Sequence, residues 1–242
     1  MSLMRQEASE APEAVARFLA RNATALAELG RRLRKLDPPV VLTSARGSSD
    51  NAAGYLKYLT EIALGIPCAS VGASVASIYA APLRVQNGLS VTISQSGKSP
   101  DIVALQDAAR RSGALTVAIV NVDDSPAARS ADICLPLHAG AEKSVAATKS
   151  FIVSLVAAAA IIAEWRTDDA LKSALSALPD QLARACALQW PGFVDCAVRA
   201  EIGSGPRFAA APVFMPKKNE SPRAARRTRK NAAACRPVTE TW

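Results

Sequence analysis

The stretch LSVTISQSGKSPD, residues 89–101, decides the fold of this chain. Residues 89–94 are rich in β-branched residues, which is typical of a strand. Pro100 suits the first position of a helix, and Ser99 is the natural N-cap residue before it. A buried strand that leads within a few residues into a helix is the repeating unit of a parallel α/β sheet.

The same alternation extends to both sides of this stretch. We expect further strands at residues 40–44, 68–72, 115–121 and 132–137. Helical periodicity predicts helices at residues 13–36, 48–64, 100–112, 125–131, 145–165 and 168–188. The sequence therefore predicts an α/β protein, a three-layer αβα sandwich with a five-stranded parallel sheet of the flavodoxin or Rossmann-like kind.

The positive charge of the chain is concentrated at its end. The 242 residues carry a net charge of +8, but residues 1–205 hold 20 Lys or Arg against 19 Asp or Glu. Residues 206–242 hold 9 Lys or Arg against 2 Glu, together with 4 prolines after Pro206. We interpret residues 207–242 as a basic, disordered tail. Because the charge lies outside the α/β region, the composition argues against a nucleic-acid partner.

Composition also limits the cofactors and the compartment. The five cysteines form no CxxC pair, and His138 is the one histidine, so we expect no metal site. The first residues contain acids and no apolar core, and the longest apolar run, 151–163, is too short to span a bilayer. These features predict a cytoplasmic protein without a membrane segment.

Two serine-rich segments follow predicted strands, where open α/β sheets bind ligands. Gly47, Ser48 and Ser49 follow the first strand, and Ser94, Gln95, Ser96 and Ser99 follow the third. Helix N-termini favour anions, and serine hydroxyls add short hydrogen-bond donors. Ordinary helix capping explains either segment alone, but the two together favour a shared phosphate site.

Nucleotide binding is the main alternative, because residues 97–99 read Gly-Lys-Ser. A phosphate-binding P-loop needs a glycine five positions before Gly97, and that residue is Thr92. No GxGxxG segment follows any predicted strand either. We therefore expect no nucleotide cofactor.

A third segment, LHAGAEKSVAATK at residues 137–149, joins the fifth strand to a long helix. It brings Glu142, two lysines and His138 to the same edge of the sheet. Taken alone, Glu142 is interpreted as an acid in the first turn of a helix, and His138 as a structural loop residue. A catalytic role for Glu142 remains the alternative.

Together the three segments resemble the sugar isomerase (SIS) domain family over about residues 35–165. SQSGKSPD is similar to the family's phosphate signature, ARGSSDNA to its G-[ST]-S motif and AEKSVAATKSF to its E-x-x-VA-[ST]-TK-x-F motif. The resemblance implies that the phosphate of a hexose or hexosamine phosphate is held by Ser48, Ser49, Ser94, Gln95, Ser96 and Ser99. It places Gly47, Val145 and Ala147 beside the sugar and Glu142 nearby. Many members have Ser where this chain has Ala147, so one sugar hydroxyl loses a partner.

The strongest resemblance is to double-SIS proteins, namely the isomerase half of glutamine:fructose-6-phosphate amidotransferase and glucosamine-6-phosphate deaminases. It implies an aldose–ketose isomerase or deaminase acting on glucosamine 6-phosphate or fructose 6-phosphate, working as a homodimer. The resemblance also implies that the catalytic Glu, Lys and His belong to the second SIS half. The alternative is a non-catalytic sugar-phosphate-binding or regulatory module, or an inactive fragment.

The segment AEIGSGP, residues 200–206, resembles the opening of that second half, after which the resemblance stops. We therefore divide the chain into an N-terminal helical segment (1–34), the SIS domain (35–165), a helix with the start of a second SIS domain (166–206) and the tail (207–242). The break after Pro206 leads to the hypothesis of a frameshift or premature end. Since the chain lacks an N-terminal cysteine nucleophile, we expect no glutaminase half.

Overall fold

Five parallel strands form the single sheet of the computed structural model, which describes residues 2–144 and 146–188. The strands are β1 (Val41–Ser44), β2 (Cys68–Ser70), β3 (Leu89–Ser94), β4 (Leu115–Val120) and β5 (Ile133–Pro136), in the spatial order β2-β1-β3-β4-β5. Every neighbouring pair is parallel. The predicted fold class is thereby confirmed.

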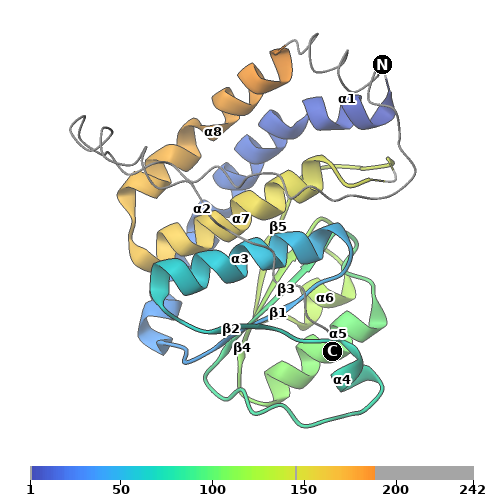
Figure 1. The fold of residues 1–242 in the computed structure, drawn as a ribbon, viewed down its shortest axis with the longest axis vertical. Coiled ribbons are helices and arrows are strands. Elements are labelled where there is room, and N and C mark those ends of the chain that lie inside the picture. Colours follow the sequence, from blue (N-terminus) through green and yellow to red (C-terminus); the bar gives the residue numbers. More distant parts are fainter. Residues whose placement is uncertain (1, 145, 189–242) are drawn as a thin grey trace, which may run out of the picture. The chain divides into compact units, whose positions relative to one another are not determined.

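Helices cover both faces of the sheet (Figure 1). One face packs against α2 (Ala11–Leu36), α3 (Ser48–Leu64) and α7 (Lys149–Arg166), and the other against α5 (Pro100–Arg111) and α6 (Pro126–Ser130). The remaining helices are α1 (Leu3–Ser9), α4 (Ser74–Ser77) and α8 (Asp169–Ala187), of which α8 packs on the outside of α2 and α7.

The core follows from the apolar runs in the sequence. All six residues of β3 and all six of β4 are buried, as expected for central strands of a sheet covered on both sides. The helix α7 is buried around most of its circumference. Gly30 lets α2 approach it closely, because a Cβ atom at Gly30 would lie 2.7 Å from the carbonyl carbon of Glu164. Any larger residue at position 30 would push these two helices apart.

The strand order places a topological switch point between β1 and β3. The chain leaves β1 toward β2 on one side, whereas the strands after β3 extend to the other side. The helix that follows β1, α3, and the helix that follows β3, α5, cover opposite faces of the sheet (Figure 1). Their N-termini therefore flank one crevice at the carboxyl edge, the usual place for a ligand in such sheets.

Most predicted boundaries agree with the structure to within two residues, but one helix start differs by more and two short helices were not predicted. The long helix predicted from residue 145 begins at Lys149, because the preceding residues form a loop held by carboxylates. The first helix begins at Ala11 rather than residue 13 and is preceded by α1, which was not predicted. The one-turn helix α4 was also missed.

The second half of the domain division lies largely beyond the described part of the chain. The helix α8 occupies the first residues of the predicted segment 166–206. The predicted strand at residues 200–206 and the tail at 207–242 fall outside the described residues. Among the helices of residues 2–144 and 146–188, none has the length and apolar character that crossing a membrane requires.

Candidate functional site

The first predicted phosphate-binding segment, Gly47, Ser48 and Ser49, lies at the start of α3 and is called the first cradle. Gly47 is the N-cap residue of this helix, with φ of 59° and ψ of −133°, a backbone conformation that a glycine adopts readily. Ser48 is exposed and Ser49 is half-buried. Because Gly47 has no side chain, no N-cap hydroxyl closes this helix start.

The second cradle, at the start of α5, consists of Ser94, Gln95, Ser96 and Ser99. Hydrogen bonds to two of its own hydroxyl oxygens fix its backbone. The buried Ser94 Oγ accepts from the backbone N of Gly97 at 3.0 Å, and Ser96 Oγ accepts from that of Lys98 at 3.3 Å. Gly97 has φ of 61°, which favours glycine. Ser99 is the N-cap residue, yet its side chain does not cap the helix. The loop is thus fixed while its helix start lacks a side-chain cap.

Two further contacts place the loops of the cradles. The backbone N of Asn121 donates to the carbonyl oxygen of the half-buried Gln95 at 3.1 Å. Arg46, in the loop after β1, forms an ion pair with Asp101 in the first turn of α5. The ion pair connects the two predicted cradles directly, although they are separated by almost fifty residues of sequence.

Three other helix starts in the described part of the chain are closed by the side chain of their N-cap residue, whereas those of α2 and α4 are not. Ser2 caps α1, Ser125 caps α6 and Asp168 caps α8, each accepting from a backbone N three residues further on, at 3.3, 3.3 and 2.9 Å. The start of α5 lacks such a bond although Ser99 is its N-cap residue, and the start of α3 lacks one because its N-cap residue is Gly47. Ordinary capping, the alternative to a phosphate site, therefore does not account for Ser99.

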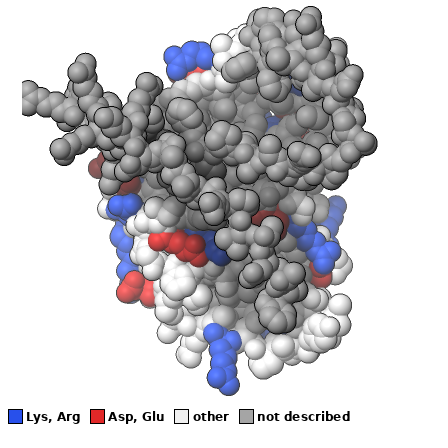
Figure 2. All heavy atoms as spheres, in the orientation of Figure 1, with Lys and Arg blue, Asp and Glu red and all other residues white. Residues whose placement is uncertain are grey.

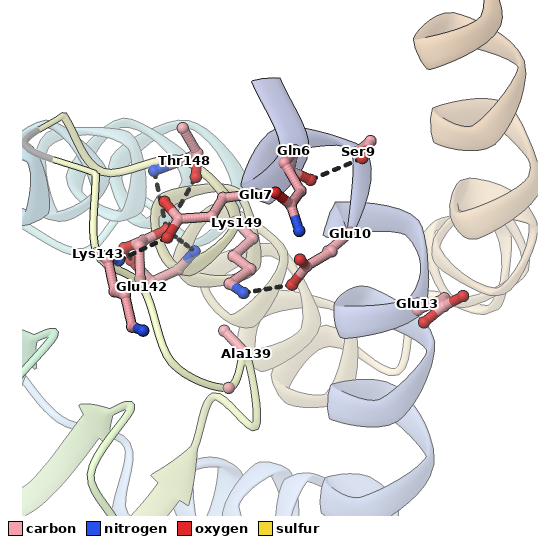
Figure 3. Close-up of polar contacts among 12 residues, drawn as sticks. Gln6, Glu7, Ser9, Glu10, Glu13, Ala139, Glu142, Lys143, Thr148 and Lys149 are labelled. Atoms are coloured by element: carbon pink, nitrogen blue, oxygen red, sulfur yellow. Dashed lines mark hydrogen bonds and ion pairs between the residues drawn. The ribbon is translucent and has the colours of Figure 1, made fainter. Parts of the chain in front are cut away.

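Glu142 lies at the start of α7 and closes it (Figure 3). Its Oε1 atom accepts from the backbone N and Oγ1 of Thr148, both at 3.0 Å, and from the backbone N of Ser150 at 3.1 Å. The Ser150 hydroxyl donates to Oε2. Burial by itself would raise the pKa of Glu142, but the hydrogen bonds from Ser150 and Thr148 outweigh it and lower the pKa. These are the contacts of a helix cap; the catalytic assignment stays a prediction.

The loop that contains Glu142 is anchored where it leaves β5. The Asn121 side chain accepts from the backbone N of Ala139 at 2.9 Å and donates to the carbonyl oxygen of Gly140 at 2.7 Å. The carbonyl oxygen of His138 accepts from Arg17 Nε at 3.2 Å. Burial and the nearby Arg21 lower the pKa of His138. His138 is thus a loop residue packed near α2, in line with its structural interpretation.

The sugar-contact predictions are only partly within the described residues. Ala147 is half-buried beside the start of α7, and Gly47 lies at the first cradle. Val145 is outside the described residues. Three residues that hold the loop, Asn121, Glu7 and Glu10, were not predicted as site residues. Asn121 does follow a predicted strand, whereas the two glutamates carry no local signal because their partners lie more than 130 positions away.

A separate cavity of about 610 Å³ lies at the opposite, amino-terminal edge of the sheet, beside Arg32, Lys35 and Arg110. Its one acid, Asp132, already binds Arg110 Nε at 3.0 Å and the backbone N of Thr116 at 2.9 Å. This cavity is remote from both serine clusters and does not belong to the site.

The surface of the described residues shows no segregation of charge where it is visible. Basic and acidic side chains lie among one another in Figure 2. Within residues 2–144 and 146–188, no three His, Cys, Asp or Glu side chains come together as a possible metal site.

These features define an α/β domain with two serine-rich helix starts at a topological switch point. The sequence pattern of the SIS domain family matches residues 38–163, and the chain belongs to that family.

Known relatives agree with this assignment. The chain is 36% identical over 162 residues to a glutamine–fructose-6-phosphate aminotransferase (isomerizing) of Streptomyces coelicolor. The aligned region covers 64% of this chain and 26% of the relative. A crystal structure of a protein assigned as a phosphosugar isomerase from Silicibacter pomeroyi is 48% identical, with a TM-score of 0.79, over 82% of this chain and 61% of that one.

A third comparison involves the C-terminal domain of glucosamine-fructose-6-phosphate aminotransferase from Francisella tularensis. It is 25% identical, with a TM-score of 0.58, over 77% of this chain and 54% of that one. The chain thus spans about a quarter of the length of the curated relatives it matches, and 61% and 54% of the two solved structures named above.

Proposed function

We propose that this chain binds the phosphate group of a hexose or hexosamine 6-phosphate between the starts of α3 and α5. The observation that carries the proposal is that Ser99, the N-cap residue of α5, does not cap its helix, while α3 begins after Gly47, which has no side chain to cap it. Backbone N–H groups and the positive helix ends then remain available to an anion. The serine-rich segments add hydroxyl donors, chiefly those of Ser48, Ser49 and Ser99.

The sugar end of the substrate would extend toward the loop before α7. Gly47 and Ala147, with the residue at position 145, are the proposed contacts. Gly47 has no Cβ that would narrow the approach. Ala147 offers no hydroxyl, so we expect weaker recognition of one sugar hydroxyl than in family members with serine there.

We further propose that the substrate class is an aminosugar or ketose 6-phosphate, and the reaction class aldose–ketose isomerisation or deamination. The named activities of the relatives support this choice. A general base must reach the proton that it removes. Glu142 has a lowered pKa and accepts four hydrogen bonds at the start of α7, so few of its lone pairs remain for a substrate.

Because Glu142 already accepts these hydrogen bonds, a second candidate function is favoured, in which this chain binds the sugar phosphate without turning it over. In that case the proton-transfer groups would be absent from the chain. The two functions share the phosphate site and differ only in chemistry, so a binding assay followed by a turnover assay distinguishes them.

A thermal shift with glucosamine 6-phosphate, followed by ammonia-release and isomerase assays, tests both candidates. The matched control is a Ser49→Ala/Ser99→Ala variant, which removes one predicted donor from each cradle. Stabilisation of the wild type but not of the variant supports the phosphate site, and turnover then decides between enzyme and binding module. If the sugar phosphate stabilises neither protein, the proposal is wrong.

We also propose that the chain forms a homodimer. Tyr55, Tyr58 and Ile62 are 40%, 65% and 79% exposed along one face of α3. Exposed aromatic and aliphatic side chains in one stripe are typical of an interface. Sedimentation of the wild type should show a dimer, and Tyr58→Glu should shift it to the monomer. A wild-type monomer at every concentration would contradict this proposal.

A further inference from the structure

The loop between β5 and α7 is held in its middle by a carboxylate from α1, near the N-terminus. Glu7, in α1, is only 4% exposed. Its Oε1 atom accepts from the backbone N of Lys143 at 2.5 Å, and its Oε2 atom from the backbone N of Ser144 at 3.1 Å. The Ser144 hydroxyl also donates to Oε2. Figure 3 shows α1 beside this loop, with Glu7 directed at it.

A buried carboxylate is stable only where hydrogen bonds replace its lost hydration. The Ser144 hydroxyl and the backbone N of Lys143 do so here, and they lower the pKa of Glu7. Hydrogen bonds to an ionised acceptor are stronger than those between neutral groups. Glu7 therefore holds the backbone of two consecutive loop residues, which a contact between flexible side chains would not do.

A second acid from the N-terminal segment acts at the end of the same loop. Lys149, the first residue of α7, is 3% exposed, and its Nζ atom lies 2.5 Å from Oε2 of Glu10. A buried ammonium group next to the positive end of a helix is unfavourable without a partner. Glu10 supplies the opposite charge and follows Glu7 by three positions in the sequence.

The loop consequently has three anchors of different origin. Asn121 holds its first residues, Glu7 its middle and Glu142 its last. The Asn121 and Glu142 anchors belong to the sheet edge and to the loop itself. The Glu7 anchor is different, because it ties the loop to α1, outside the region that the family pattern matches. The residues between the Glu7 and Glu142 anchors include Ala147.

We propose that Glu7 is a positioning residue for sugar recognition, fixing residues 143–144 so that the following residues reach the sugar. Glu10 supports it by fixing Lys149. This inference rests on the proposed function, since it assumes a sugar phosphate bound with its sugar end at this loop. It assigns the N-terminal helices a task separate from the phosphate site, which is built from the starts of α3 and α5.

The test compares a Glu7→Gln variant with a Glu13→Gln control in the full chain. Glu13 lies in the first turn of α2, with a side chain 82% exposed and 3.7 Å from Arg17. Affinities for inorganic phosphate and for glucosamine 6-phosphate are measured by calorimetry. We expect Glu7→Gln to bind glucosamine 6-phosphate about tenfold more weakly and to bind inorganic phosphate like the wild type. The control should match the wild type for both ligands.

Hydrogen exchange supplies a readout that a general loss of stability would not mimic. In Glu7→Gln the backbone amides of Lys143 and Ser144 should exchange faster, while those of β3 should not change. If Glu7→Gln does not fold, Ser144→Ala removes one donor to Glu7 and should give the same selective loss, about threefold. Equal losses for both ligands, or none, would overturn the inference and leave the phosphate site standing. A wild type that binds neither ligand would instead overturn the proposed function.

Discussion

Ser99 and Ser125 occupy the same position in two helices, but only Ser125 caps its helix. Each is an N-cap residue followed by proline at the first helical position. The Ser125 Oγ atom accepts from the backbone N of Ala128 at 3.3 Å, whereas the Ser99 side chain makes no such bond in α5. Two N-cap serines that each precede a proline thus differ in their hydrogen bonds, and the effect of each can be measured separately.

The first prediction concerns this pair. Ser125→Ala should lower the free energy of unfolding by about 1 kcal/mol, the usual effect of losing a cap. Ser99→Ala should change it by less than about 0.5 kcal/mol but weaken phosphate binding about tenfold. Urea unfolding and phosphate titration measure the two effects. Equal destabilisation by both variants would show that Ser99 acts as a cap.

The second prediction compares two glycines with positive φ. A Cβ atom at Gly97 would lie 2.7 Å from Cβ of Ser125, whereas nothing lies within 4 Å of one at Gly47. Gly97→Ala should therefore suffer both backbone strain and a clash, with a loss of about 2–4 kcal/mol. Gly47→Ala should lose only about 1 kcal/mol. Thermal unfolding tests the order, and a larger loss for Gly47→Ala would contradict it.

The third prediction concerns acid stability. The pKa of Glu142 is lower in the folded chain than its ordinary value of 4.5, because the hydrogen bonds from Ser150 and Thr148 outweigh burial. A depressed pKa stabilises the fold above the unfolded pKa, and this contribution disappears as the pH falls through the folded pKa. Glu142→Gln should therefore be less stable than the wild type at pH 7, by about 1 kcal/mol.

The difference between Glu142→Gln and the wild type should then shrink as the pH falls below about 4.5. Melting temperatures from pH 3 to pH 7 provide the measurement. Glu28→Gln is a suitable control, since Glu28 is exposed and pairs only with Arg31 in the neighbouring turn. A difference between Glu142→Gln and the wild type that stays constant with pH would mean that ionisation of Glu142 is not its cause.

The fourth prediction concerns the departure from the family pattern at Ala147. Because Ala147 is half-buried, a serine hydroxyl can be added there without overpacking the core. If position 147 contacts the sugar, Ala147→Ser should tighten glucosamine 6-phosphate binding about threefold to tenfold. Inorganic phosphate binding should not change. Calorimetry with both ligands checks the result, and equal gains for both would place the new hydroxyl at the phosphate instead.

The layered fold and the region of the proposed site could be predicted from local patterns in the sequence. Short apolar runs such as residues 117–120 are typical of strands covered on both faces, and Gly and Pro mark where helices begin and end. Serines after β1 and β3 therefore had to lie at the carboxyl edge. Both effects depend on neighbours within a few positions along the chain, which is why sequence reasoning could reach them.

Which of those polar groups already form hydrogen bonds within the chain is visible only in the folded structure. The sequence could not reveal that the Glu142 carboxylate caps α7, or that this helix begins at Lys149 rather than at residue 145. It gave no sign that Glu7 holds Lys143 and Ser144, because that contact spans 136 positions. Hydrogen bonds between segments so far apart arise only when helix packing brings them together, and no local periodicity records them.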